Sequence, residues 1–202
     1  MRLSILQYGD PILRAKGKQI DQIDNRIREL AQNMLETMRA ANGIGLAGQQ
    51  VGEPLQLTVL DISQVEDRPS TMKLNGEDVD PKAAMPLVLI NPLITLSEGS
   101  AVGTEGCLSF PEITGEIERA ESVSVRAQTL ENKTIEIEAT GLLARALQHE
   151  ADHLNGILFI DRMSSAAKAS LSSRLKRLQK ETQRGQRRRA QDRELPIGEN
   201  AL

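Results

Sequence analysis

The residues that decide the fold are Gly141-Leu142-Leu143-Ala144-Arg145-Ala146-Leu147-Gln148-His149-Glu150-Ala151-Asp152-His153-Leu154-Asn155-Gly156. Apolar positions 143, 146, 147, 151 and 154 repeat at the three- and four-residue spacing of one helical face. Gly156 supplies the stop that a helix C-terminus needs. We therefore predict a helix over 141–155 that passes through the core, and this helix carries both histidines of the chain, His149 and His153.

The spacing of the two histidines predicts a metal site. On a helix, side chains four residues apart share one face, with Cβ atoms about 5–6 Å apart, so two such imidazoles can bind one divalent ion. Glu150 lies one step around the helix, close enough to take a proton from a water that the ion activates. Two surface histidines beside a glutamate are the alternative, and the apolar helical face favours the metal site.

A catalytic site of this kind needs a third protein ligand and one open position for water. The chain has no third histidine, so the candidates are Cys107 or a carboxylate. Cys107 lies in Thr104-Glu105-Gly106-Cys107-Leu108-Ser109-Phe110-Pro111, where glycine and proline indicate an irregular but defined backbone. A single buried cysteine is usually a small hydrophobic residue. Beside a histidine pair that lacks one ligand, however, Cys107 is the favoured third ligand.

The other segments predict an α+β domain. Asp24–Ala41 has helical periodicity and ends at Asn42-Gly43, where glycine suits a C-terminal cap. A third helix is expected from Ser164, grading into a tail that we expect to be disordered from Ala190. Because strands cluster in the middle, we predict mostly antiparallel strands packed around a central metal-binding helix, with a C-terminal helix. The predicted strands are Leu55–Ile62, Leu87–Asn91, Val123–Ala127 and Thr134–Ala139, the last two joined by a turn at Glu131–Lys133.

Two segments are expected to be irregular. Gly43-Ile44-Gly45-Leu46-Ala47-Gly48-Gln49-Gln50 lacks the Lys-Ser/Thr of a phosphate-binding loop and follows no strand, so nucleotide binding is not expected. It offers close backbone approach to a ligand and two side-chain amides, Gln49 and Gln50, as oxyanion donors. Ser63–Met85 is polar and contains prolines and a glycine, so we expect a surface insertion without a core role.

Size and composition exclude several classes of protein. A chain of 202 residues with 39% hydrophobic and 26% charged residues suits one globular domain. No apolar run reaches the roughly 18 residues of a membrane span, and no signal or transit segment is evident. The single cysteine suits a reducing compartment. We therefore expect a cytoplasmic protein of bacterial type that binds no membrane and no DNA, although an organelle-processed form would look alike.

Three segments, in order, resemble the motifs of the peptide deformylase family. Gly43–Gln50 resembles the first, with Gly48 where a second alanine is usual. Glu105-Gly106-Cys107-Leu108-Ser109 matches the second, and Gln148–Gly156 matches the third. The opening Gly9-Asp10-Pro11-Ile12-Leu13-Arg14 is also similar. The resemblance implies a catalytic domain over 1–165, including the insertion 63–85, followed by a basic helix and tail over 166–202.

The resemblance implies a hydrolase that removes the formyl group from the N-terminal formyl-methionine of newly synthesised polypeptides and releases formate. Cys107, His149 and His153 would bind the metal, which is often Fe(II) in this family. Zn(II), Ni(II) and Co(II) are also compatible with two imidazoles and a thiolate. Glu150 would deprotonate the attacking water and pass the proton to the departing amine.

The resemblance also assigns roles around the reacting group. The Gln50 side-chain amide and the Leu108 backbone N–H would stabilise the oxyanion. The substrate would lie extended beside Gly43, Ile44 and Gly45, with its methionine side chain in an apolar pocket and Arg119 near its backbone. We expect Gly48 to loosen the loop that presents Gln50, and an insertion folded over the cleft to alter the substrate range.

Charge is unevenly distributed along the chain. Between Lys168 and Arg189 there are nine lysines and arginines and one acid, Glu181. Because the whole chain carries −3 and this segment +8, the remaining residues carry −11. In bacterial relatives the C-terminal helix is implicated in ribosome docking, so the resemblance implies a salt-sensitive contact between 168–189 and RNA phosphates. A solvated helix without a partner is the alternative.

Two other functions fit parts of the sequence. A zinc endopeptidase shares the His-Glu-x-x-His pattern, but it takes a further histidine or a downstream carboxylate as third ligand, and the chain has no further histidine. An RNA-binding module with a structural metal would use Cys107, His149 and His153 to close its fold, but it lacks a fourth ligand and gives Glu150 no role. Replacing Glu150 separates an enzyme, which loses turnover, from a module, which is unaffected.

Overall fold

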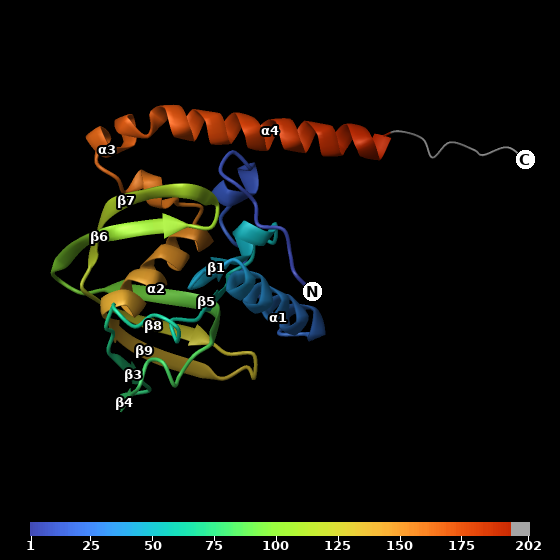
Figure 1. Cartoon of the computed structure of the whole chain (residues 1–202). Coiled ribbons are helices and arrows are strands. Elements are labelled where there is room, and N and C mark those ends of the chain that lie inside the picture. The colour runs from blue at the N-terminus through green and yellow to red at the C-terminus, as the bar shows by residue number, and fades with distance from the viewer. Residues whose placement is uncertain (195–202) are drawn as a thin grey trace, which may run out of the picture.

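The protein consists of a seven-stranded sheet, a two-stranded hairpin and a helix, α2 (Gly141–Leu154), that lies between them (Figure 1). This computed structural model describes residues 1–194, with side chains described as far as Arg188. The strand order in the sheet is β1-β2-β5-β8-β9-β3-β4, and neighbouring strands are antiparallel. The predicted α+β class, with antiparallel strands around a central helix and a further helix at the C-terminus, is confirmed.

The elements have the following bounds. The sheet contains β1 (Gly45–Ala47), β2 (Leu57–Leu60), β3 (Met72–Leu74), β4 (Glu77–Val79), β5 (Leu87–Leu96), β8 (Ser122–Gln128) and β9 (Thr134–Thr140). The hairpin contains β6 (Ser100–Cys107) and β7 (Phe110–Ala120). The other helices are α1 (Asn25–Ala40), α3 (Ser165–Ser170) and α4 (Ser172–Glu194), with short 3-10 helices η1 (Pro11–Arg14), η2 (Gly48–Val51) and η3 (Phe159–Asp161).

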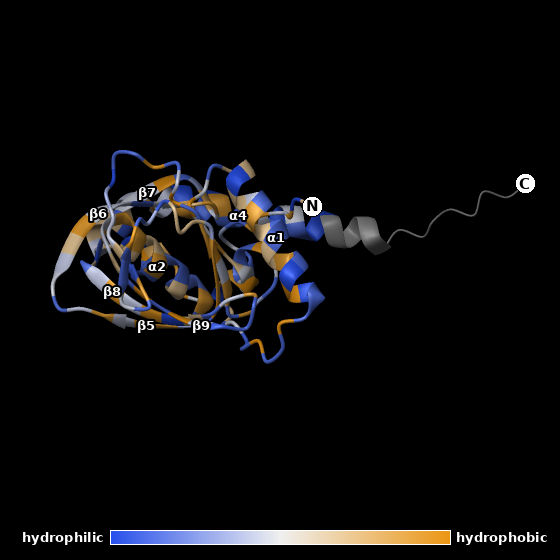
Figure 2. Ribbon diagram, turned by 90° about the horizontal axis from the view of Figure 1, so that it is seen from below, coloured by the Kyte–Doolittle hydropathy of each residue, from blue (hydrophilic) through white to orange (hydrophobic). Residues whose placement is uncertain are grey.

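Three hydrophobic clusters hold these elements together. The first joins the inner face of the sheet to α2, through residues such as Leu143 and Leu147. The second packs α1 on β1 and β2, and the third joins the hairpin to η3 and α4. Hydrophobic residues gather around α2, which is surrounded by the other elements (Figure 2). Because removing apolar surface from water is the main driving force of folding, this arrangement fixes α2 at the centre.

The ends of α1 follow from local hydrogen bonding. Asp24 caps the N-terminus, where its side chain accepts a hydrogen bond of 2.9 Å from the Ile27 N–H. At the C-terminus Asn42, with φ 55°, takes the left-handed conformation, and the Gly43 N–H donates to the Met38 carbonyl at 2.9 Å. The predicted glycine cap is therefore wrong by one residue. Gly43 is needed for another reason, because a Cβ there would lie 2.6 Å from Leu108 Cδ1.

The central strands are confirmed, but β5 is longer than the predicted Leu87–Asn91. It continues to Leu96 past a bulge between Ile90 and Leu93. Asn91 there has φ 51°, and Pro92, which has no N–H to donate, falls within the bulge. The bulge thus lets the strand continue through a proline that, in the sequence, marks its end.

The backbone around Cys107 is more regular than predicted. Thr104–Cys107 belongs to β6 and Phe110 begins β7, so irregularity is confined to the turn at 108–109 and a register shift after Gly106. The predicted loop 43–50 is likewise largely regular. Gly45–Ala47 forms the edge strand β1, and Gly48 begins η2. The strands in both segments were not predicted because glycine is favoured in loops, whereas here it permits close packing.

The expectation that 63–85 has no core role is wrong. Met72 is only 2% exposed, lies in the same cluster as α2, and begins β3, which pairs with β9. The segment also caps α2: the Pro69 carbonyl accepts from the Leu142 N–H at 3.3 Å, and Ser70 Oγ accepts from the Leu143 N–H at 3.0 Å. Its polar residues are compatible with this position because β3 and β4 lie at the edge of the sheet.

The C-terminal helix is divided and longer than expected. Ser164 caps α3, as its Oγ accepts from the Ala167 N–H, and α4 follows α3 after Leu171. α4 continues to Glu194, so the prediction of disorder from Ala190 is wrong for 190–194, while the remainder of the predicted tail, 195–202, lies outside the described residues. No helix within the described residues is long and apolar enough to cross a membrane.

Candidate active site

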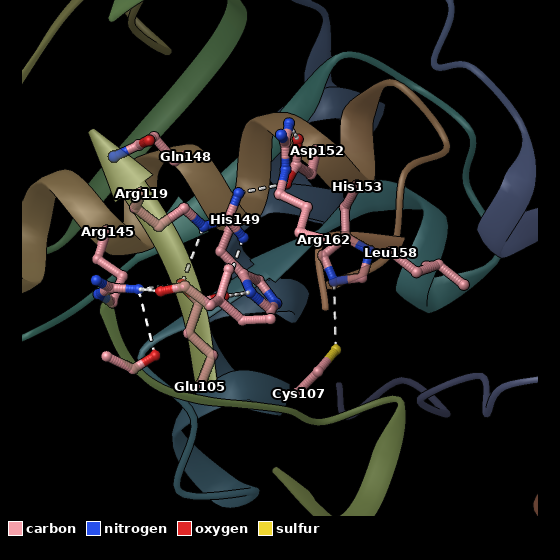
Figure 3. A network of polar contacts seen from close by, with 12 residues as sticks. Glu105, Cys107, Arg119, Arg145, Gln148, His149, Asp152, His153, Leu158 and Arg162 are labelled. Carbon is pink, nitrogen blue, oxygen red and sulfur yellow. Dashed lines mark hydrogen bonds and ion pairs between the residues drawn. The ribbon is translucent and has the colours of Figure 1, made fainter. Parts of the chain in front are cut away.

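Cys107, His149 and His153 come together as the sequence predicts. Cys107 lies at the end of β6, and the two histidines project from one face of α2, so that their ligand atoms all lie within 4.8 Å of one another. Cys107 Sγ is 3.3 Å from His153 Nε2 (Figure 3). A tetrahedral ion with bonds of about 2.3 Å to sulfur and 2.0–2.1 Å to nitrogen separates these atoms by about 3.5 Å. The donor set and its spacing therefore fit one divalent ion.

His149 is oriented by a carboxylate. Its Nδ1 lies 3.0 Å from Glu105 Oε2, an arrangement in which Nδ1–H donates and Nε2 is left for a metal. Burial lowers the pKa of His149, but hydrogen bonds with Cys107 and Glu105 outweigh it and raise the pKa to about 10. Burial lowers the pKa of His153 well below its usual value. A proton on His149 thus competes with a metal, and metal binding releases it.

Glu105 is the centre of a buried ionic network (Figure 3). It accepts two hydrogen bonds of 2.9 Å from Arg119 and one of 2.9 Å from Arg145. Burial opposes ionisation, but hydrogen bonds from His149 and Arg119 prevail and lower the pKa of Glu105 to about 2. Arg119 also pairs with Asp152 on α2, and Asp152 pairs with Arg162. The network ties both hairpin strands to the helix that carries the histidines.

The expectation that Arg119 binds substrate is wrong. Its side chain is almost fully buried, and its guanidinium is occupied by Glu105 and Asp152. Arg119 is also absent from the lining of the cavity beside the metal ligands. The physical reason is charge balance, since two buried carboxylates need a buried cation.

Glu150 lies beside the ligands, enclosed by β1 and β2. Thr58 Oγ1 donates to its Oε2 at 3.4 Å, and a Cβ at Gly45 would lie 2.2 Å from Oε1. The backbone of β1 therefore lies directly against the carboxylate. Burial raises the pKa of Glu150 to about 7, although the neighbouring His149 opposes the shift. A carboxyl group whose pKa lies near neutral pH is suited to accepting and donating protons.

Of the two amides proposed as oxyanion donors, only Gln50 reaches the cavity. Its Oε1 accepts a hydrogen bond of 2.8 Å from the Ala47 N–H, which turns its NH₂ group toward Cys107 Sγ at 3.5 Å. Gln49 is fully buried, and its Nε2 donates to the Leu154 carbonyl at 3.2 Å. Leu108 lines the cavity. Within residues 1–194, its N–H donates no hydrogen bond to a backbone carbonyl of a turn or loop.

Gly48 is closely packed in the segment that presents Gln50. A Cβ at Gly48 would lie 2.4 Å from the Glu53 carbonyl oxygen and 3.2 Å from that of Leu55. The glycine is buried and lets these backbones approach closely at the start of η2. The effect of Gly48 on the positioning of Gln50 stays a prediction.

Cys107, His149 and Glu150 line a cavity of about 500 Å³, and His153 lies behind this lining within 4.8 Å of the other two ligands. Gly43 and Ile44, which precede β1, and Gly45, its first residue, are part of the lining. β1 pairs only with β2 in the described sheet, so its second edge is available to an extended chain. Apolar side chains supply part of the remaining lining: Phe110, Pro111, Ile113, Leu142 and Ala146.

Several residues of this site were not predicted. Glu105 stands two residues before Cys107, and a carboxylate beside a ligand-bearing segment was the available signal for a partner of histidine. Thr58, Arg145 and Asp152 carry no such pattern, because their contacts arise only when β2, the hairpin and α2 pack together. Arg68, from the segment taken for a surface insertion, also lines the cavity.

Known sequences match this chain over most of its length. The family model described as polypeptide deformylase matches residues 2–169. A peptide deformylase of Opitutus terrae is 44% identical over 184 residues, covering 90% of this chain and 95% of the relative. A peptide deformylase of Bartonella tribocorum is 45% identical over 179 residues, covering 88% and 93% respectively.

Solved structures agree with these relatives. A plant peptide deformylase superposes with a TM-score of 0.79 at 38% identity, covering 91% of this chain and 92% of that one. The Thermotoga maritima peptide deformylase has a TM-score of 0.69 at 36% identity, covering 81% and 99%. Together with the cluster of Cys107, His149 and His153, these matches show that the chain belongs to the polypeptide deformylase family.

Proposed function

We propose that this protein removes the formyl group from the N-terminal formyl-methionine of newly synthesised polypeptides. Water adds its oxygen to the formyl carbon, the carbon–nitrogen bond breaks, and formate and a free amine are released. The observation that carries the proposal is the Cys107–His149–His153 donor set, of which Cys107 and His149 line one cavity together with Glu150. Sequence and structural likeness to proteins named peptide deformylase supports it.

The donor set would hold one divalent ion, with Fe(II) as the first candidate and Zn(II), Ni(II) or Co(II) as alternatives. When bound, such an ion supplies Lewis acidity that lowers the pKa of water toward neutrality and polarises a carbonyl oxygen. The protein's own contribution is to keep the ligands in place. Glu105 orients the His149 ring, and Glu105 is itself held by ion pairs with Arg119 and Arg145.

Glu150 moves the proton in this proposal. Its carboxylate accepts a proton from the attacking water and then donates it to the nitrogen of the departing amine. Burial, the hydrogen bond from Thr58 and close contact with Gly45 hold the carboxylate in one position. A base held in this way loses little entropy when the reaction begins.

Gln50 and Leu108 stabilise the negative charge that develops on the formyl oxygen. The Gln50 NH₂ group is aimed past Cys107 Sγ because Ala47 holds the other end of the amide. The Leu108 N–H lies in the turn next to Cys107. Donors of this kind, fixed before the reaction, each contribute about 2.7–4 kcal/mol to comparable acyl-transfer reactions.

The substrate would bind as an extra strand along β1. Gly43–Gly45 line the cavity beside the edge strand β1, and an extended peptide can pair with such an edge. The methionine side chain would then enter the apolar part of the lining near Ile113, Leu142 and Ala146. Glycine at 43 and 45 is required by the close contacts with Leu108 and Glu150.

Formate release from a formyl-Met-Ala-Ser peptide tests the proposal. The protein is loaded with Fe(II) under anaerobic conditions, because air oxidises Fe(II) and the Cys107 thiol. We expect formate from this peptide and none from its acetyl-Met counterpart. Cleavage of an internal peptide bond would instead support the endopeptidase alternative, and a folded, metal-bound protein that releases no formate would contradict the proposal.

We also propose that α4 makes a salt-sensitive contact with ribosomal RNA. Lys176, Arg177, Lys180, Arg184, Arg187 and Arg188 are exposed on it. Truncation is an unsuitable test, because Leu175 is buried in the third cluster and Arg174 donates to the Glu112 carbonyl. The triple variant Lys180→Glu/Arg184→Glu/Arg187→Glu should lose co-sedimentation with ribosomes at low salt. The matched variant Lys73→Glu/Lys82→Glu/Lys133→Glu should retain it, and equal binding by both would contradict the contact.

A further inference from the structure

We propose that Arg68 selects substrates by charge, binding acidic side chains in the residues that follow the methionine. The inference rests on the proposed deformylation and concerns the part of the peptide beyond the reacting group. Arg68 lines the same cavity as Glu150 and the metal ligands, but it comes from the 63–85 segment, away from the three motifs.

The position of Arg68 is fixed by its neighbours. The next residue, Pro69, accepts a hydrogen bond from the Leu142 N–H, and Ser70 Oγ accepts one of 3.0 Å from the Leu143 N–H. The same contact is close, because a Cβ at Gly141 would lie 2.1 Å from the Pro69 carbonyl oxygen. Arg68 is therefore attached to the first turn of α2, the helix that carries His149 and His153.

The charge of Arg68 has no partner in the part of the chain whose side chains the structure describes. Arg145, the other arginine of the cavity lining, is engaged by Glu105 and by the carbonyls of Ile117 and Ala101. Arg68 is exposed, and its side chain makes no hydrogen bond and no ion pair within 4 Å to any of residues 1–188, whose side chains the structure describes. A guanidinium presents five donors that suit a carboxylate, so an acidic substrate side chain is its natural partner.

The site of this contact lies at the cavity opening. Exposed Glu112 also lines the cavity, so the opening carries one cation and one anion from different elements. The substrate residues that follow the methionine would extend out of the apolar part of the cavity and pass the exposed side chains of Arg68 and Glu112. A fixed cation there attracts a carboxylate and repels a lysine or arginine, and the effect weakens with salt because both partners are in contact with solvent.

Charge reversal provides the test. The substrates are C-terminally amidated formyl-Met-Ala-Ser, formyl-Met-Ala-Glu and formyl-Met-Ala-Lys, with matched peptides that carry the charge at the second residue. At low salt we expect kcat/KM for the wild-type protein to be about threefold to tenfold higher with the acidic peptide than with the basic one. Arg68→Glu should invert this ratio, and 0.5 M salt should reduce it toward one.

Lys82→Glu is the matched control, because Lys82 lies in the same segment, is exposed and does not line the cavity. It should keep the wild-type ratio. An unchanged ratio in Arg68→Glu, or an equal loss of kcat/KM for all three peptides in Arg68→Gln, would overturn charge selection. Because the neutral peptide is measured alongside, absence of formate from it would overturn the proposed function itself, which is a separate result.

Discussion

Gly45 and Glu150 determine how closely the edge of the sheet approaches the reactive carboxylate. A Cβ at position 45 would lie 2.2 Å from Glu150 Oε1 and 2.8 Å from its carboxyl carbon. Both atoms are buried, and the glutamate is also held by Thr58 on the neighbouring strand β2. One glycine thus shapes the cavity wall and fixes the proposed base.

Gly45→Ala should displace the Glu150 carboxylate without affecting the metal ligands. Because a displacement of a catalytic group by about 1 Å can reduce the rate about 100-fold, we expect kcat/KM for formyl-Met-Ala-Ser to fall about 10–100-fold. Metal content, measured by elemental analysis, should stay at the wild-type value. Gly185→Ala is the control, since no atom lies within 4 Å of a Cβ built there; equal activity in both variants would contradict this role for Gly45.

Glu105 is a second residue whose replacement has a distinct signature. Glu105→Gln removes the acceptor of His149 and leaves Arg119 and Arg145 with fewer partners. We expect metal affinity to fall about 10–100-fold and the free energy of unfolding to fall by about 3–5 kcal/mol, because a buried cation is left uncompensated. Competition with a chelator and urea unfolding measure the two quantities.

Glu136 on β9 provides the comparison. Glu136→Gln makes the same chemical change as Glu105→Gln, but at an exposed carboxylate. It should change neither metal affinity nor stability. If Glu105→Gln were also neutral in both measurements, the buried network would have no role in holding the ligands.

At the residue scale, the sequence predicted the groups whose chemistry is local. His149, His153 and Glu150 are close in the chain, so helical spacing alone brings them together. Arg119 was misassigned because its role depends on burial between Glu105 and Asp152, which are far from it in sequence. Pairing across elements is not visible in a single chain's residue pattern.

At the scale of elements, α2 was predictable because one long apolar face repeats over four turns. β6 and β7 were not predicted, because charged residues and glycines interrupt their alternation and the hairpin buries only part of one face. β3 was not predicted because a strand of three residues, here second from the edge of the sheet, gives almost no pattern. The cap of α2 was not predicted because Ser70, which provides it, is far from α2 in the sequence.

Ser70→Ala tests that cap. Thr140, the residue before α2, makes no side-chain cap hydrogen bond, and Ser70 Oγ accepts from the Leu143 N–H instead. Loss of a capping side chain costs about 1 kcal/mol, so we expect the free energy of unfolding to fall by this amount in urea. Ser173→Ala, on the exposed side of α4, should be neutral; equal stability of the two variants would contradict the capping role.

At the scale of the whole molecule, α4 lies across the hairpin and the N-terminal segment (Figure 1). Leu175 packs in the third cluster, Arg174 donates to the Glu112 carbonyl, and Gln186 Nε2 donates to Asp10 at 2.6 Å. The helix therefore contacts both ends of the domain. Its basic residues lie apart from an otherwise acidic chain, as the charge distribution predicted.

Metal binding should stabilise the whole fold. The ligands come from the hairpin and α2, so the site exists only in the folded state, and a ligand at 100 times its Kd adds about 2.7 kcal/mol. For a protein of this size we expect Tm to rise by about 5–10 °C on metal loading, measured by calorimetry. His153→Ala should abolish most of the rise, and a Tm independent of metal in the wild-type protein would contradict the site.

In the proposed mechanism Cys107, His149 and His153 hold one metal while Glu150 carries the proton. Paired measurement of metal content and formate release in Glu150→Ala tests it most directly. We predict one bound metal per chain, as in the wild-type protein, with formate release from formyl-Met-Ala-Ser reduced by at least about 100-fold. A variant that keeps its metal and its rate of formate release would contradict the claim.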